Sequence, residues 1–414
     1  MTSRSTLYRS KTLLTMDGRP PMAGGAIIVQ RGLIEAAGSY KDLRTGHDGG
    51  EVDLGAVTLL PGLINAHCHL DFTIMRGAIL RTTKFSAWIR RLNELKRTLT
   101  DDDYLASIAN GFWELKRWGT TTVLNIESFP ELMVRMPPPP IRTWWFYELL
   151  DIRNRIHTED VVAGALSFFE SHRNWLGGYG LSPHAPYTTS LGLYELAGFC
   201  ADKYGMPFTT HLAETDEEMQ MFADGSGPMW EFLAGLGRNM DDTGGTTPIQ
   251  HLLNARVLPT GSILAHMNQL SPRDLEALAP HAHRFSVVHC PNCHEFFSRP
   301  QFPYEALRDL GMRISLGTDS CASNCGLNLF SEMRAFQRTF PDVRPEEILR
   351  MVTTHPAAAL GQQGKLGVLA PGAAADFIAV PDLGISGDIF STLIETSSPP
   401  SHVFVNGADV THAA

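Results

Sequence analysis

The chain has 414 residues, of which 43% are hydrophobic and 19% charged, and its formal net charge is −10. This composition is typical of a globular protein with one large and one smaller domain, and the acidic balance argues against nucleic acid or an anionic membrane as a partner. No apolar segment reaches the roughly 18–20 residues of a membrane helix, no signal peptide is recognisable, and six cysteines in so long a chain form no disulfide framework, so we expect a soluble, cytoplasmic protein.

The two ends of the chain are β-rich and lack long helical patterns. Short strand-like segments separated by glycine-rich turns occur within residues 1–60, for example at 26–29 and 57–60. The same pattern returns after residue 367, at 377–380 and 402–405. We predict that residues 1–60 and 367–414 pair into one small sheet domain beside a domain of residues 61–366.

The central part alternates helix-like and strand-like segments. Thr100 and the three aspartates that follow it cap a helical pattern through residue 116, Gly119 ends that pattern, and residues 121–126 read as a buried strand. The same order recurs at 190–203 with 206–210, at 271–278 with 285–288, and at 304–309 with 312–316. Repeated helix and strand units predict parallel strands joined by crossover helices, and an α/β barrel keeps its chemistry at the ends of such strands.

Two histidines end the first apolar run of this central part. Residues 60–71 read LPGLINAHCHLD, so His67 and His69 stand one residue apart. On a β-strand, side chains at positions i and i+2 point to the same side, so both imidazoles can hold one cation. Sixteen histidines produce some close pairs by chance, and this pair alone does not decide between metal binding and another role.

Further polar residues follow apolar runs later in the chain. His211 ends one such run and is followed by Glu214, His266 ends another, and Asp319 follows residues 314–318. Taken singly, each histidine could be a hydrogen-bonded core residue and Asp319 a turn or helix-capping residue. Together, in order and each at a predicted strand end, they predict a metal site.

Imidazoles and a carboxylate suit zinc, whereas hard cations prefer cages of oxygen ligands. Three histidines and an aspartate from different strand ends, with water in the open position, would make a catalytic site, because the pKa of the bound water falls to about 7. Glu214, three residues past His211, can lie beside that water without being a ligand, take its proton and hand it to the substrate.

Other motifs have competing interpretations. Cys290 and Cys293 form a single C-x-x-C pair that does not match the H-x-E and P-C-x-x-C order of cytidine-type zinc deaminases, which favours a structural role, with His289, Asn292 and His294 as candidate pocket residues. Glu148 follows an aromatic segment at a predicted strand end, where it can touch a substrate. A mobile lid and simple packing both remain open for the apolar residues Met219, Met221, Phe222, Met229 and Trp230.

Several motifs run in order through nearly the whole chain. They are PGLINAHCH at 61–69, SPHAPY at 182–187, THLAET at 210–215, AH at 265–266, HCP at 289–291, LGTDS at 316–320, GKLG at 364–367 and PGAAADF at 371–377. On these motifs the chain resembles the amidohydrolase superfamily, in its branch of purine and pyrimidine aminohydrolases. The resemblance implies a distorted (β/α)8 barrel, also called a TIM barrel, with a flanking β-sandwich built from both termini.

The resemblance also implies a set of site residues. One divalent metal ion, zinc or alternatively iron, would be held by His67, His69, His211 and Asp319. Glu214 would be the proton shuttle, His266 and Asp319 would orient the water, and His184 would lie near the sugar or ring of the substrate. Relatives with two metals carry a bridging lysine on the fourth strand, and residues 180–184 contain none, which favours one metal.

Within the branch, the chain is similar to deaminases of S-adenosylhomocysteine, methylthioadenosine and aminodeoxyfutalosine, and residues 85–90, 290–297 and 319–324 lean toward the last group. The homocysteine-type enzymes place a ribose-binding glutamate after the tryptophan-containing helix start, where this chain has Arg97. This difference argues against S-adenosylhomocysteine and methylthioadenosine as main substrates. We expect the substrate to contact Trp88, Glu148, His184 and His294.

The leading hypothesis is a metal-dependent aminohydrolase of an adenine-type nucleoside, in which hydroxide attacks the amino-bearing carbon and ammonia leaves. Alternatives among enzymes are deamination of guanine, cytosine or a pterin, dechlorination of a triazine, or opening of a cyclic amide. A catalytically silent scaffold is a separate class, against which the intact residue set argues. The expected partner is a small-molecule substrate, without nucleic acid or membrane, and a homo-oligomer stays open.

Overall fold

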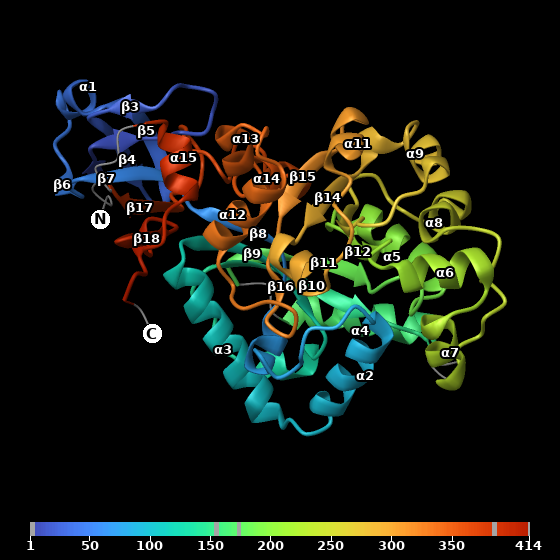
Figure 1. Cartoon of the computed structure of the whole chain (residues 1–414). Coiled ribbons are helices and arrows are strands. Elements are labelled where there is room, and N and C mark those ends of the chain that lie inside the picture. Colours follow the sequence, from blue (N-terminus) through green and yellow to red (C-terminus); the bar gives the residue numbers. More distant parts are fainter. Residues whose placement is uncertain (1–4, 153–156, 172–174, 383–386, 413–414) are drawn as a thin grey trace.

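The computed structural model describes residues 5–152, 157–171, 175–382 and 387–412. Helices surround a barrel of parallel strands, and a β-rich part that contains both ends of the chain lies at one side of it (Figure 1). Among the described residues, no helix has the length and apolar character needed to cross a membrane.

The barrel strands form two parallel groups, with the orders β11-β10-β9-β8-β16 and β12-β13-β14-β15. A parallel bridge between Leu181 and Phe208 joins the groups on one side. On the other side β16 follows β15 after two residues and pairs with β8, so the barrel closes. The strands are β8 (Leu63–His69), β9 (Thr120–Glu127), β10 (Arg142–Leu149), β11 (Gly177–Pro183), β12 (Thr209–Leu212), β13 (Ile263–His266), β14 (Ser286–His289), β15 (Arg313–Leu316) and β16 (Asp319–Ser320).

Helices follow the barrel strands and cover the outside of the barrel (Figure 1). Those of the central part are α2 (Phe85–Lys96), α3 (Asp101–Arg117), α4 (Thr158–Ser171), α5 (Leu191–Tyr204), α6 (Asp216–Asp224), α7 (Pro228–Gly235), α8 (Pro248–Ala255), α9 (Pro272–Leu278), α10 (Pro291–Phe296), α11 (Tyr304–Asp309), α12 (Leu329–Thr339), α13 (Pro345–Arg350) and α14 (Thr354–Ala359). Three short 3-10 helices lie among them, at Leu70–Met75, Pro130–Arg135 and Ala282–Arg284.

Local capping signals explain where two of these helices begin and end. The Thr100 side chain accepts a hydrogen bond from the backbone of Asp103, and the Asp103 side chain reaches back to Thr100, which starts α3 as predicted. Ser190 caps α5, and Gly205 ends it in the left-handed conformation with φ of 63°.

The strand predicted at residues 206–210 begins later, at Thr209, and ends at Leu212. The reason is local, because the Met206 N–H still donates to the Ala201 carbonyl at 2.9 Å and so belongs to the end of α5. Pro207 then has no N–H to give to a sheet.

Two sheets pack on each other beside the barrel, one built from both ends of the chain and the other from the N-terminal part alone. The mixed sheet has the order β19-β18-β17-β7-β2-β3, and the second sheet has the order β5-β4-β1-β6. Tyr8 of the second sheet contacts Phe377 and Phe404 of the first, edge to face, with ring centroids 5.2 and 5.1 Å away. The elements are β1 (Thr6–Arg9), β2 (Thr12–Leu13), β3 (Met22–Ala23), β4 (Gly25–Gln30), β5 (Leu33–Ser39), α1 (Tyr40–Arg44), β6 (Gly50–Asp53), β7 (Val57–Pro61), β17 (Phe377–Pro381), α15 (Ile389–Ile394), β18 (His402–Val405) and β19 (Ala408–Asp409).

The mixed sheet, which contains β7, leads directly into the barrel, since only Gly62 separates β7 from β8. The sandwich expected from the two termini is therefore present as packed sheets. The domain boundaries at residues 60/61 and 366/367 stay a prediction.

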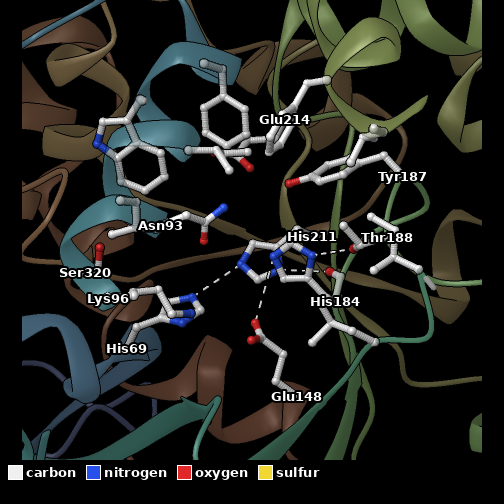
Figure 2. A pocket seen from close by; sticks show the side chains of 18 of the residues that line it. His69, Asn93, Lys96, Glu148, His184, Tyr187, Thr188, His211, Glu214 and Ser320 are labelled. Atoms are coloured by element: carbon white, nitrogen blue, oxygen red, sulfur yellow. Dashed lines mark hydrogen bonds and ion pairs between the residues drawn. The ribbon is translucent and has the colours of Figure 1, made fainter. Parts of the chain in front are cut away.

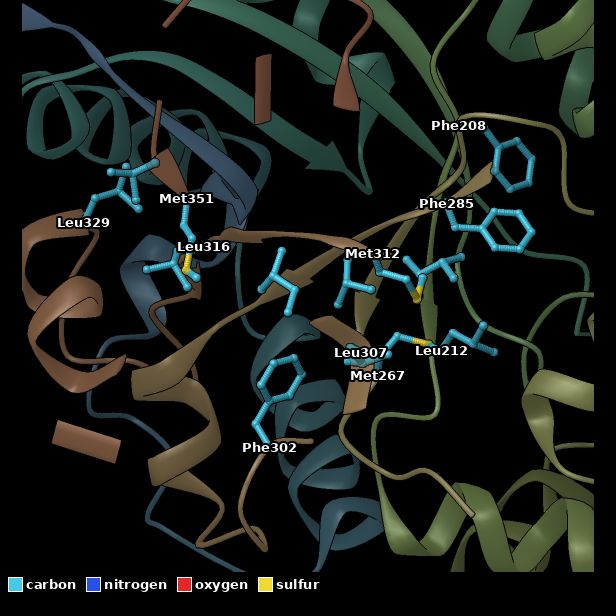
Figure 3. Close-up of a cluster of buried hydrophobic side chains, with 14 of the residues drawn as sticks. Phe208, Leu212, Met267, Phe285, Phe302, Leu307, Met312, Leu316, Leu329 and Met351 are labelled. Atoms are coloured by element: carbon cyan, nitrogen blue, oxygen red, sulfur yellow. The ribbon is translucent and has the colours of Figure 1, made fainter. Parts of the chain in front are cut away.

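The apolar core between the strands and the outer helices fixes the strand ends. Figure 3 shows Leu212, Met267 and Leu316 within this cluster, together with Phe302 and Leu307. Because side chains alternate along a strand, Leu212 points outward into the core while its neighbour His211 points into the barrel. Core packing thus places polar residues inside the barrel.

Candidate metal centre and active site

Buried polar side chains meet at one end of the barrel. His67 and His69 stand at the end of β8, His211 lies on β12, His266 ends β13, and Asp319 begins β16. The possible ligand atoms of His67, His211 and His266 lie within 4.8 Å of one another, and so do those of His67, His69 and Asp319. The structure therefore brings together all residues predicted to bind or flank the metal.

The distances within this cluster suit a single zinc-sized ion. The Nε2 atoms of His69 and His211 lie 3.3 Å apart, and Asp319 Oδ1 lies 3.7 Å from His67 Nε2 and 3.8 Å from His69 Nε2. In a tetrahedral zinc site with bonds of about 2.0–2.2 Å, neighbouring ligand atoms are about 3.4 Å apart. His67, His69 and Asp319 are thus spaced to share one ion, and His211 lies next to His69.

Two hydrogen bonds orient the side chains of two candidate ligands, His211 and Asp319. His211 Nδ1 lies 2.8 Å from the carbonyl oxygen of His184, which accepts its hydrogen and leaves Nε2 with a free lone pair. The thiol of Cys293 donates to Asp319 Oδ2 at 2.8 Å, so Oδ1 faces the histidines. Cys293 therefore has a role beyond packing. Local sequence gave no sign of it, because residues 293 and 319 meet only in the fold.

Burial sets the protonation of the cluster. It lowers the pKa of His67, His69 and His266 well below the ordinary value, so their ring nitrogens are available to a cation at neutral pH. Burial also raises the pKa of Asp319, an effect that a bound cation offsets. His67 Nε2 is buried and has no hydrogen-bond partner among the described residues, as expected of an atom that binds a metal ion.

Glu214 lies beside this cluster without belonging to it. The chain turns sharply at Ala213, whose φ is 50°, and Glu218 accepts hydrogen bonds from the backbone N–H groups of Ala213 and Glu214 at 3.2 and 2.7 Å. Glu214 Oε1 lies 3.8 Å from His266 Nε2 and accepts a hydrogen bond from Arg299 Nη2 at 2.7 Å. The predicted proton shuttle is therefore held in place at the cluster, and the sequence did not reveal Arg299.

The cluster forms the polar floor of a cavity of ≈ 230 Å³. Figure 2 shows His69, His184, Glu148 and His211 facing the same space, with Glu214 on another side of it. The opposite walls are apolar and come from α2, α7 and their neighbours: Phe72, Phe85, Trp88, Ile89, Leu92, Phe232, Leu233 and Leu236. A cavity with a polar floor and apolar walls suits a flat heterocycle.

Three of the four predicted substrate-contacting residues line this cavity, namely Trp88, Glu148 and His184. His184 Nδ1 lies 2.6 Å from the Thr188 hydroxyl, and its Nε2 lies 3.9 Å from Glu148 Oε1. Burial lowers the pKa of His184 to about 4, so the ring is neutral at pH 7 and can exchange hydrogen bonds with a hydroxyl group.

The structure does not place the fourth predicted substrate-contacting residue, His294, at this cavity. His294 is not among the cavity-lining residues, and both of its ring nitrogens are engaged elsewhere, with Asn268 Oδ1 at 3.2 Å and the Pro300 carbonyl at 2.6 Å. The helix α10 directs this side chain away from the cavity and toward Asn268, which in turn bonds the backbone carbonyl of Glu214. Neither His289 nor Asn292 lines the cavity.

The residue that faces the cavity near the end of α2 is Lys96, not Arg97. The cavity face of this helix consists of Phe85, Trp88, Ile89, Leu92, Asn93 and Lys96, which follows the 3.6-residue period of a helix. Arg97 falls outside that stripe. The periodicity of α2 was therefore a usable sequence signal for Asn93 and Lys96.

The methionine-rich segment lies in α6 and α7. Met221, Phe222 and Met229 are fully buried, so packing accounts for them. Phe232 and Leu233 of α7 line the cavity.

Gly317 lets the strand before Asp319 lie against His67. A Cβ at residue 317 would stand 2.8 Å from the His67 carbonyl oxygen and 2.9 Å from its backbone nitrogen. We expect Gly317→Ala to destabilise the protein by about 1–3 kcal/mol through overpacking, and to weaken metal binding. The control is Gly192→Ala, at an exposed position of α5 where nothing stands closer than 3.8 Å. Denaturant unfolding and metal analysis check both variants, and equal behaviour would contradict this role of Gly317.

Comparison with known proteins places this site in a family. Residues 58–410 match the Amidohydrolase family. The 5-methylthioadenosine/S-adenosylhomocysteine deaminase of Pyrococcus furiosus is 30% identical over 373 residues, which cover 86% of this chain and 81% of that protein. The structure of Helicobacter pylori aminofutalosine deaminase in complex with methylthio-coformycin superposes with a TM-score of 0.86 at 18% identity, covering 98% of this chain and 100% of that one. Atrazine chlorohydrolase from Arthrobacter aurescens, complexed with zinc, gives 0.82 at 21% identity, covering 98% and 95%.

These similarities confirm the predicted α/β barrel fold and the relation to nucleoside deaminases, and they show that a chlorohydrolase shares the fold. A structural neighbour binds zinc, in agreement with the histidine cluster described above. The match covers most of the chain. It begins within β7, which precedes the barrel in the sequence, and includes β17 and β18, which follow the barrel. The chain belongs to the amidohydrolase family and is a metal-dependent hydrolase.

Proposed function

We propose that this protein is a hydrolytic deaminase of adenine-type nucleosides that carry a substituent on the 5′ carbon. The observation that carries the proposal is that Glu214 lines the cavity beside a cluster that could hold a divalent ion. That ion, zinc in the first place, would be held by His67, His69, His211 and Asp319. When bound there, it would supply a water molecule whose pKa is about 7.

The side chains of this site can perform the proton transfers of deamination. Glu214 accepts a proton from the attacking water and delivers it to the ring nitrogen next to the amino-bearing carbon. A carbon–oxygen bond forms at that carbon, and the carbon–nitrogen bond to the amino group breaks. The second water proton leaves with the amino group as ammonia. His266 and Asp319 flank the water and orient it.

The walls of the cavity support an adenine ring with a sugar. Phe85 and Trp88 stack at 5.5 Å between ring centroids and present an aromatic surface to the cavity. His184, Glu148 and Asn93 also line the cavity and supply hydrogen-bonding groups for a ribose. The names of the Pyrococcus and Helicobacter relatives point to the same class of nucleoside.

Deamination of a 5′-extended adenine nucleoside, such as aminodeoxyfutalosine, should be at least about 10²-fold more efficient in kcat/KM than deamination of free adenine. The physical reason is that groups built to bond the sugar are left unpaired when the sugar is missing. Ammonia release from both compounds gives the ratio. A ratio near one would mean that the protein does not recognise the sugar.

A wider screen of product release separates the proposed function from the alternatives. Purified protein loaded with zinc is offered adenine nucleosides, guanine, cytosine, a pterin and a chlorotriazine, and ammonia and chloride are measured. The proposal expects ammonia and the highest kcat/KM with an adenine nucleoside. A best substrate that loses chloride, or one without an adenine-type ring, would replace it.

A further inference from the structure

A buried arginine lies directly behind Glu214. The side chain of Arg299 is only 6% exposed, and its Nη2 donates to Glu214 Oε1 at 2.7 Å. The guanidinium carbon stands 4.5 Å from the centre of the Phe297 ring and 5.6 Å from that of Phe85. A cation enclosed in this way has little freedom to leave its carboxylate partner.

A chain of contacts through His294 and Asn268 also links the segment of Arg299 to the backbone of Glu214. The carbonyl of Pro300, next to Arg299, bonds His294 Nε2 at 2.6 Å, and His294 Nδ1 lies 3.2 Å from Asn268 Oδ1. Asn268 Nδ2 in turn donates to the backbone carbonyl of Glu214 at 3.1 Å. The segment after α10 is thereby tied to both the main chain and the side chain of Glu214.

Stability alone is a poor explanation for this arginine. In the part of the chain that the structure describes, Glu214 is the one carboxylate in ion-pair contact with Arg299, and Arg299 Nη1 has no hydrogen-bond partner. Replacing a buried ion pair by apolar residues often leaves a protein equally stable or more so. A buried guanidinium with one nitrogen left without a hydrogen bond is better explained by an effect of Arg299 on the reactivity of Glu214.

Direct substrate binding by Arg299 does not fit the geometry. Phe85 and Glu214 line the cavity, whereas Arg299 contacts both of them but does not line it. Any effect of Arg299 on the reaction must therefore pass through Glu214.

We propose that Arg299 is a positioning residue for Glu214. By engaging Oε1, it fixes the rotation of the carboxylate, so that Oε2 is the oxygen left for the water and the ring nitrogen. It also balances the negative charge of a carboxylate whose side chain is only 5% exposed. This inference rests on the proposed role of Glu214 in deamination.

Arg299→Met tests the proposal, because methionine has a similar length but neither the charge nor the hydrogen bonds. We expect kcat to fall about 10–10²-fold, as for other small misplacements of a reacting group, while KM and metal content stay within about twofold of wild type. Arg299→Lys should recover part of kcat, and methylguanidinium should partly restore Arg299→Ala. The control is Arg338→Met, which removes an exposed arginine paired with Glu295 and should leave kcat unchanged.

The decisive readout is the double variant Glu214→Gln with Arg299→Met. If Arg299 acts through Glu214, adding Arg299→Met to Glu214→Gln should lower kcat by less than about twofold more. An equal loss in both backgrounds, or unchanged kcat in Arg299→Met, would overturn the positioning role. Absence of ammonia release by the wild-type protein would instead overturn the proposed function, so the two failures are distinguishable.

Discussion

Replacing Glu214 by glutamine is expected to lower kcat about 10²–10⁴-fold, the contribution that a general acid–base group makes to catalysis. Glutamine has nearly the size of glutamate but cannot take a proton from water. Its amide oxygen can still accept the hydrogen bond from Arg299, so the fold should survive. Ammonia release at saturating substrate gives kcat, and metal analysis of the same sample shows that the site is still loaded.

Asp216→Asn is the matched control for this variant. Asp216 is exposed, lies two residues from Glu214 in the first turn of α6, and does not line the cavity. The same change of charge there should leave kcat within about twofold of wild type, since exposed positions away from the site have small effects. Near-normal turnover by a metal-loaded Glu214→Gln protein would exclude Glu214 as the proton shuttle.

Replacing His67 and His69 together by alanine is expected to empty the metal site and to reduce activity to background. Two of the four proposed ligands are lost, and the remaining His211 and Asp319 cannot complete a tetrahedral site. Wild-type protein should carry about one zinc or iron ion per chain. Elemental analysis after dialysis against a weak chelator measures the ratio of metal to protein.

The double variant His157→Ala with His283→Ala serves as its control. Both histidines are exposed, so their removal tests whether any histidine loss lowers the metal content. The control should retain about one ion per chain and full activity. Full occupancy in the His67 and His69 variant would mean that the metal is held elsewhere.

Local signals made much of the barrel predictable. Thr100, Ser190 and Gly205 act through bonds to residues a few positions away, and such bonds can be read from the sequence. The alternation of His67 and His69 on a strand is equally local. Their convergence with Asp319 was predictable only because parallel strands bring their ends to one edge of the barrel.

Contacts between residues far apart in the chain escaped prediction. The Cys293 thiol on α10 bonds Asp319 at the start of β16, and Arg299 bonds Glu214. The partners of each pair lie far apart in the chain, so neither contact leaves a local pattern. The orientation of His294 could not be read from the sequence either, because the rotation of the short helix α10 decides whether its ring faces the cavity or Asn268.

The most direct test of the proposed function is the dependence of ammonia release on metal in wild-type protein with an adenine nucleoside as substrate. We predict one ammonia per nucleoside consumed, loss of activity when a chelator removes the metal, and recovery when about one zinc per chain is restored. Protein that holds one zinc per chain and releases no ammonia from any adenine nucleoside would contradict it.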